Sequence, residues 1–209
     1  MDKVGIAILN EKPDGLPSIG HRATHCNMVA EARKGKAFYA EDINYSCGFA
    51  IYTLGLGRDV PAFRKALAED LVSIKNAAGM EISGKLLEST PRLREGEKFI
   101  VFFPLDRMPM EPDVVLIFGN PSEIMDLVWK ITGQTGERLR SSIGGIGSTC
   151  SECTAQPIIS GEPNLSVGCC GTRRFGRLDD NEIMLSLPWK KYKSLIVPHD
   201  QGLSDPSSA

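Results

Sequence analysis

The chain has 209 residues, of which 42% are hydrophobic and 24% charged, and its formal net charge is −2 at pH 7. This balance is typical of a globular protein, and it excludes a disordered chain and a generally basic surface for nucleic acid. The longest apolar stretches, such as Asp113 to Gly119, fall far short of the ~20 residues that a membrane span needs. The early apolar run from Val4 to Leu9 is too short for a secretory signal, so we expect a cytosolic protein.

Helices are expected in the first third of the chain. The segment from Ile19 to Phe38 predicts a helix that ends near Gly35, because a residue without Cβ suits a left-handed cap. A short apolar helical segment follows at 46–56, with Ser46 as its N-cap. From Val60 to Asn76, apolar residues at helical spacing predict an amphipathic helix.

Strands are expected in the middle of the chain and again near its end, with a further helix between them. The continuously apolar runs Lys98–Leu105 and Asp113–Gly119 predict strands that are covered on both faces. A helix should begin near Pro121, and the alternation over 183–187 predicts a half-buried strand. Helices and strands without strict βαβ alternation indicate an α+β fold, a mixed sheet with packed helices. We expect one domain over residues 1–199 and a flexible, small and polar C-terminal tail over 200–209.

The sequence contains six cysteines. Because thiols of a cytosolic protein stay reduced, metal binding or redox chemistry is favoured over disulfide bonds. In the stretch GGIGSTCSECTAQP, Thr149 and Glu152 fit a capping box with Thr149 as N-cap. Cys150 would then lie in the first turn of a helix, where unpaired N–H groups lower a thiol pKa, with Cys153 on the same face. Pro157 limits this helix to about two turns.

The other thiols also lie near the ends of predicted elements. Cys47 follows Ser46 at a helix start, Cys26 lies within the first predicted helix, and Cys169 and Cys170 close a predicted strand. Each could instead be a small buried hydrophobe, which is common for free cysteine. The i,i+4 spacing of His21 and His25 suits a metal pair on one helix, and two solvent-facing histidines explain it equally well.

Four segments together resemble the uncharacterised ArCR family of archaea and bacteria, over about Arg22 to Trp189. They read HCNMVAEARKGKAFYAEDINYSCGFAIYTLGL, VVLIFGNPSEIMDLV, GSTCSECTAQPIISGEPNLSVGCCGTRRF and NEIMLSLP. The cysteines of the family pattern correspond to Cys26, Cys47, Cys150 and Cys169, its Cys-x-Gly-x-Arg run to Cys169, Gly171 and Arg173, and its acidic residue to Glu182. Cys153 and Cys170 are additional, so either could replace its neighbour. The resemblance implies a four-thiol site and no particular reaction.

Four thiolates suit an iron–sulfur cluster or a structural zinc ion. Zinc is the second choice, because its ligands usually come as close pairs, whereas these four are widely spaced. A cluster favours glycine-lined amides that donate to its sulfurs, which Gly145 and Gly171 could supply. The loop GGIGS lacks the Lys-Ser/Thr ending of a phosphate loop, which disfavours a nucleotide site.

The sequence therefore predicts an iron–sulfur protein, with a 4Fe–4S cluster on Cys26, Cys47, Cys150 and Cys169. Its role would be electron transfer, redox sensing or a redox reaction on a small anionic ligand that Arg173 holds. Alternatively, Arg173 belongs to a solvated turn with surface ion pairs. The rival function is a cluster-free module whose reactive thiols bind a small molecule or a metal. Expected partners are a small anionic ligand or a redox protein, with neither nucleic acid nor membrane.

Overall fold

The computed structural model describes residues 1–57 and 59–197, and the predicted domain boundary at 199 and tail over 200–209 lie outside them. A six-stranded sheet in the order β2-β3-β1-β4-β6-β5 carries helices on both faces, which confirms the α+β class. The strands are β1 (Asp2–Leu9), β2 (Phe38–Ala40), β3 (Phe99–Pro104), β4 (Val114–Gly119), β5 (Asn164–Ser166) and β6 (Ile183–Pro188).

Every pairing between these strands is antiparallel within the described residues. The six named strands therefore do not form the mixed sheet that the sequence predicted. Parallel pairing within the described residues occurs in two isolated bridges outside these strand pairings, Ser18 with Tyr39 and Ala23 with Tyr45. The strands predicted from continuous apolar runs are confirmed as β3 and β4, and almost all of their residues are buried. The alternating strand is confirmed as β6, but its predicted half-burial is wrong, because Met184 and Ser186 are buried as fully as Leu185 and Leu187.

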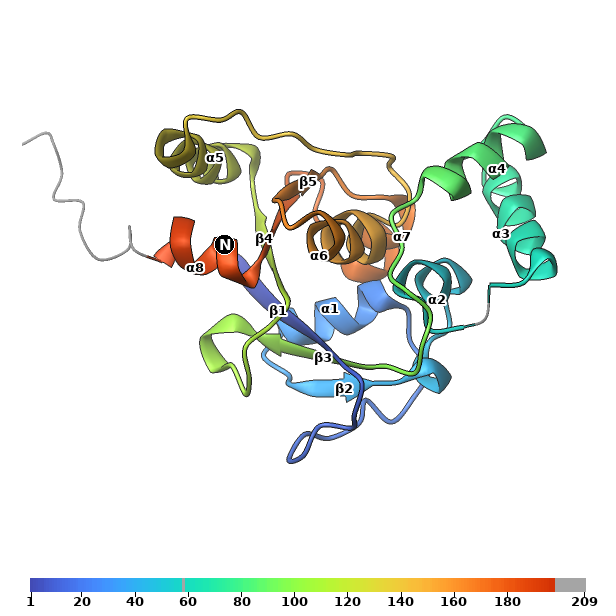
Figure 1. Cartoon of the computed structure of the whole chain (residues 1–209), viewed down its shortest axis with the longest axis horizontal. Helices are drawn as coiled ribbons and strands as arrows, with labels where there is room; N and C mark the ends of the chain where they lie inside the picture. The colour runs from blue at the N-terminus through green and yellow to red at the C-terminus, as the bar shows by residue number, and fades with distance from the viewer. Residues whose placement is uncertain (58, 198–209) are drawn as a thin grey trace, which may run out of the picture.

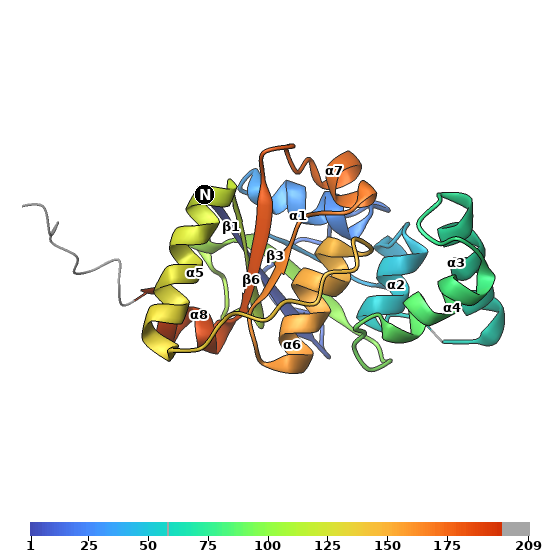
Figure 2. The ribbon, with the colours of Figure 1, turned by 90° about the horizontal axis from the view of Figure 1, so that it is seen from above.

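Helices cover the two faces of the sheet unequally. They are α1 (His25–Arg33), α2 (Gly48–Leu54), α3 (Pro61–Ser73), α4 (Met80–Ser89), α5 (Pro121–Thr135), the π-helical segment η3 (Ser148–Ala155), α6 (Gln156–Ser160), α7 (Cys170–Gly176) and α8 (Trp189–Leu195). Short 3-10 turns occur at η1 (Asp42–Asn44) and η2 (Leu105–Arg107). On one face α5 and α8 pack against Val115 and Leu185, and on the other α1, α2 and η3 pack against Phe102 and Met184 (Figure 2).

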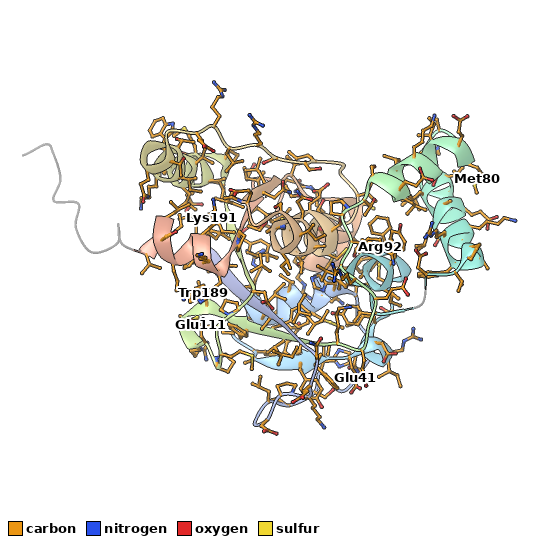
Figure 3. The ribbon with its side chains drawn as sticks, viewed as in Figure 1. Glu41, Met80, Arg92, Glu111, Trp189 and Lys191 are labelled. Carbon is orange, nitrogen blue, oxygen red and sulfur yellow. The ribbon has the colours of Figure 1, made fainter. Side chains whose placement is uncertain are left out.

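The helical hairpin α3–α4 projects from one side of the molecule (Figure 1). It is joined to α2 through Arg92, whose guanidinium lies 4.4 Å from the ring centroid of Tyr52 and forms an ion pair with Asp59 (Figure 3). Leu67 of α3 packs in the same apolar cluster as Tyr52. The hairpin is therefore fixed against α2, the helix that follows Cys47.

Two predicted helix starts are wrong, and two predicted helices are confirmed. The first helix begins at His25, not Ile19, because Thr24 is its N-cap and accepts a hydrogen bond from the Asn27 N–H at 3.1 Å. It ends at Arg33, and residues 38–40 form β2. Cys47, not Ser46, is the N-cap of α2. The predicted helices over 60–76 and from Pro121 are confirmed as α3 and α5.

Candidate functional site

The four cysteines of the predicted site all lie at the start of a helical segment. Cys26 is the second residue of α1, Cys47 is the N-cap of α2, Cys150 is the third residue of η3 and Cys169 is the N-cap of α7. Both α1 and α2 pack against η3, and α1 packs against α7 (Figures 1 and 2). The fold thus brings together helix starts from both ends of the chain.

The thiols themselves are neighbours. The hydroxyl oxygen of Thr172 lies 3.3 Å from the sulfur of Cys169 and 3.8 Å from the sulfur of Cys26. A Cβ added at Gly171 would lie 3.7 Å and 4.0 Å from the same two sulfurs, so Gly171 lies beside them. Burial is the main cause that raises the pKa of Cys150, and negative charge on Cys26, Cys47 or Cys169 raises it further.

Burial controls the acidity of these thiols. Cys150 is only 4% exposed, and burial, with the charge of the neighbouring thiols, raises its pKa well above the ordinary value. The lowered pKa predicted from a helix start is therefore wrong, because loss of hydration outweighs the helix N-terminus. Burial also raises the pKa of Cys26 to about 12, although the hydroxyls of Thr149 and Thr172 act in the opposite direction.

The segment that carries Cys150 is a buried π-helix rather than an ordinary helix with a capping box. The carbonyl of Gly147 accepts from the N–H groups of both Ser151, at 2.6 Å, and Glu152, at 3.2 Å. Gly147 occupies the N-cap position, so the predicted capping role of Thr149 is wrong. Such i,i+5 segments are rare and frequently occur at functional sites.

Glu152 anchors the glycine-rich loop instead of capping the helix. Its carboxylate accepts from the N–H groups of Gly144 at 2.7 Å and Gly145 at 2.8 Å, and also from the hydroxyl of Ser166. The N–H of Gly145, predicted to face a cofactor, is thus directed at Glu152. Gly145 supports the loop that leads into η3.

The two additional cysteines lie in different surroundings. Cys153 is fully buried against the hydroxyls of Ser186 and Ser166, and burial raises its pKa. Cys170 is exposed, as the first residue of α7. The strand predicted to end at the cysteine pair is confirmed as β5, but its predicted end is wrong, because β5 ends at Ser166 and Cys169 is the N-cap of α7.

The two charged residues singled out by the family pattern hold the structure around the site. Arg173 donates from its two terminal nitrogens to the backbone carbonyls of Asp179 and Val167, each at 2.8 Å. Arg173 thus connects the segment before α7 with the segment after it, and its guanidinium is directed at backbone oxygens. Glu182 accepts from both terminal nitrogens of Arg33, at 2.7 Å and 3.1 Å, which fastens α1 to the start of β6.

Sequence reasoning missed the polar groups behind the thiols. His25 is 1% exposed, with Nδ1 lying 3.4 Å from the Tyr45 hydroxyl and Nε2 lying 3.2 Å from the Thr154 hydroxyl. The solvent-facing interpretation of His25 is therefore wrong, and His21 is exposed before α1 begins, so the two do not share a helix face. No local motif indicated the burial of His25, because its two partners lie 20 and 129 positions away in the sequence.

The thiols are not arranged around a single point. Within residues 1–57 and 59–197, no group of three or more His, Cys, Asp or Glu side chains is placed to hold one metal ion. The Thr172 hydroxyl contacts the sulfurs of both Cys26 and Cys169. In addition, the Ser148 hydroxyl is buried two residues before Cys150 and has no hydrogen-bond partner in the described part of the chain.

Comparison with known proteins identifies a family over nearly the whole chain. The model of the family described as "Uncharacterised ArCR" matches residues 2–197. The chain is also similar to Uncharacterized protein MJ0308 of Methanocaldococcus jannaschii, with 27% identity over 187 residues, covering 89% of this chain and 80% of the relative. No solved structure matches. None of the described helices combines the length and apolar character needed to cross a membrane.

Proposed function

The chain belongs to the uncharacterised ArCR family, and we propose that it is an iron–sulfur or related metal-thiolate protein whose ligands are Cys26, Cys47, Cys150 and Cys169. One observation carries the proposal: four thiols from opposite halves of the chain converge at the starts of four helical segments. Soft thiolate donors select zinc, copper or iron–sulfur clusters over hard cations. A convergence of four such donors is unusual for cysteines that serve only as apolar filling.

The spacing of the thiols favours a cluster over a zinc ion. With zinc–sulfur bonds of about 2.3 Å, four tetrahedral ligands lie roughly 4 Å apart, in mutual contact. Here the Thr172 hydroxyl touches both Cys26 and Cys169, and Gly171 leaves space beside the same sulfurs. In the described residues no three His, Cys, Asp or Glu side chains are placed around one ion position, and a 4Fe–4S cluster, which is bound by four cysteines, spaces its ligands around several metal atoms.

The proposed role is electron transfer or redox sensing in the cytosol. An iron–sulfur cluster supplies a one-electron couple whose potential depends on hydrogen bonds and exposure. Cys26, Cys47 and Cys169 are half-buried, which places the site near the surface and within reach of a redox protein or a small anionic ligand. Catalysis on such a ligand would need Arg173 to exchange its two backbone carbonyl partners for the anion.

Anaerobic purification with iron and sulfide analysis tests this function. We expect brown protein with broad visible absorbance and roughly four irons per chain, and substitution of a ligand cysteine should reduce the iron content. Colourless protein that takes up no iron on anaerobic reconstitution would contradict the proposal. Zinc at one equivalent would support a metal-thiolate protein without a cluster.

A second function, a cluster-free module with reactive thiols, is favoured by one observation. Cys170 is exposed beside the half-buried Cys169, and the thiols do not surround a single ion position in the described residues. Stoichiometric capture of a thiol-reactive small molecule by metal-free protein, without iron uptake, would favour this alternative.

A further inference from the structure

Two threonine hydroxyls lie between the thiols of α1 and α7. The hydroxyl oxygens of Thr149 and Thr172 are 2.9 Å apart, and the residues are 2% and 1% exposed. Thr172 contacts the sulfurs of Cys169 and Cys26, and, against the larger effect of burial, the Thr149 and Thr172 hydroxyls both lower the pKa of Cys26. Water therefore does not compete for these contacts.

Close packing of α7 on α1 creates this arrangement. A Cβ added at Gly176 would lie 3.3 Å from the Cβ of Cys26, so only glycine allows the two helices to approach this closely without adjustment. Thr172 is the third residue of α7, and its backbone N–H donates to the sulfur of the N-cap Cys169 at 3.4 Å. Cys169 thus accepts from the backbone N–H of Thr172 and also contacts its hydroxyl, where either atom can donate.

The number of hydrogens determines what the pair can do. Each threonine hydroxyl carries one hydrogen, while Thr172 has three polar neighbours: Thr149, Cys26 and Cys169. A neutral thiol can donate its own hydrogen, but a thiolate or metal-bound sulfur can only accept. When both sulfurs are negative, the hydroxyl of Thr172 can donate to Cys169 while that of Thr149 donates to Cys26.

We propose that Thr172, supported by Thr149, is a positioning residue that donates hydrogen bonds to negative charge on Cys169 and Cys26 and thereby raises the reduction potential of the site. Donors directed at sulfur stabilise the state with the additional electron, because that state carries more negative charge. The effect on potential rests on the proposed function. The effect on the free thiols does not.

Metal-free protein tests the donor role directly. Thr172→Val removes the hydroxyl at nearly constant volume, and Thr172→Ser keeps it. The rate at which Cys169 is alkylated is followed by peptide mass spectrometry at one mildly alkaline pH. Loss of a typical hydrogen bond lowers the thiolate population about fivefold. Higher nucleophilicity of the remaining thiolate compensates in part, so we expect alkylation about threefold slower in Thr172→Val and near wild type in Thr172→Ser.

Thr154→Val is the matched control. The Thr154 hydroxyl is equally buried and donates to the backbone carbonyl of Thr149 at 2.7 Å, and it makes no hydrogen bond to a thiol in the described part of the chain. A wild-type rate in Thr172→Val, or equal slowing in Thr172→Val, Thr172→Ser and Thr154→Val, would overturn the donor role.

Reconstituted protein provides the second measurement, the midpoint potential from an anaerobic redox titration. We expect the potential to fall in Thr172→Val and to return toward wild type in Thr172→Ser. If wild-type protein holds iron and the potential of Thr172→Val is unchanged, the inference fails and the proposed function stands. If wild-type protein takes up no iron, the proposed function fails, and the alkylation rates alone decide the donor role.

Discussion

The sulfur of Cys26 lies 3.8 Å from the hydroxyl oxygen of Thr172, a residue 146 positions further along the chain. This contact joins the first helix of the protein to α7, and Cys169 lies on the other side of the same hydroxyl at 3.3 Å. The site of the four thiols is thus formed by tertiary contacts between segments distant in the sequence. Variants that change the environment of one thiol should leave most of the fold intact.

The adjacent pair Cys169 and Cys170 separates a ligand from a bystander. Cys169 faces Thr172 and Cys26, whereas Cys170 is exposed. We expect Cys169→Ser to lose most of the bound iron and Cys170→Ser to retain it, as measured in anaerobically purified protein. Iron loss confined to Cys170→Ser would show that the ligand is the exposed neighbour.

The same comparison applies to Cys150 and Cys153. Burial raises the pKa of both thiols; charge on Cys26, Cys47 and Cys169 raises that of Cys150 further, whereas Cys153 lies against serines of β5 and β6 and is affected less by Cys169 than by these serines. Cys150→Ser should lose the cofactor, and Cys153→Ser should keep it with some loss of stability, because both sites are buried. The measurements are iron and sulfide content together with the unfolding midpoint. Equal iron contents in the two variants would contradict the assignment.

Thiol accessibility gives a prediction that needs no cofactor. In metal-free protein under native conditions, a thiol reagent should modify Cys170 first and Cys150 and Cys153 last. Burial raises the pKa of both buried thiols and shields them from the reagent. Timed alkylation with mass spectrometry of peptides checks the order. Early modification of Cys150 would instead support the hypothesis that Cys150 is a reactive thiol at a helix start.

His25 should make the stability of the metal-free protein depend on pH. Burial lowers its pKa from 6.5 to about 3. As the pH falls below about 6.5, the unfolded chain therefore binds a proton that the folded protein excludes, and stability declines by up to about 1.4 kcal/mol per pH unit until the pH approaches 3.

Denaturant unfolding between about pH 7 and pH 5 measures this effect. The decline should be shallower in His25→Gln, which does not titrate. The exposed His21 provides the control, because His21→Gln changes a side chain that is hydrated in both states and should follow wild type. A slope in His25→Gln equal to that of wild type would rule out His25 as the source.

Gly171 tests whether the space beside the sulfurs is needed. An alanine Cβ would lie 3.7 Å from Cys169 and 4.0 Å from Cys26, at ordinary contact distance, so Gly171→Ala should fold normally. It should hold less iron, because the methyl group occupies the space next to two ligands. Gly133→Ala on α5 is the control, since no atom lies within 4 Å of its added Cβ. Both should gain up to about 1 kcal/mol in helix stability, and full iron in Gly171→Ala would mean that this space is not used.

Sequence periodicity predicted the elements that local composition determines. The apolar runs of β3 and β4 and the spacing of α3 and α5 need no distant partner to be recognised. The first helix was predicted too long because its flanks are held by remote pairings, Ser18 with Tyr39 and Ala23 with Tyr45. Such pairings leave no periodic signal in the segment itself.

The four cysteines could be chosen as candidates from the sequence, whereas the acidity and the contacts of their thiols could not be predicted. The acidity of Cys150 depends on what covers it, and the whole of η3 is buried by elements distant in sequence. Thr172 and His25 acquire their contacts in the same way. Helix-start arguments use only the local backbone, so they gave the wrong direction for the pKa of Cys150.

The distance in sequence between the thiols has a consequence for biosynthesis. Cys47 is translated about 120 residues before Cys169, which corresponds to roughly 6–24 s at typical rates of synthesis. During that interval the thiols of the N-terminal half have no α7 to pack against. A group held by all four cysteines would therefore be inserted only after nearly the whole chain has left the ribosome, which makes its delivery post-translational.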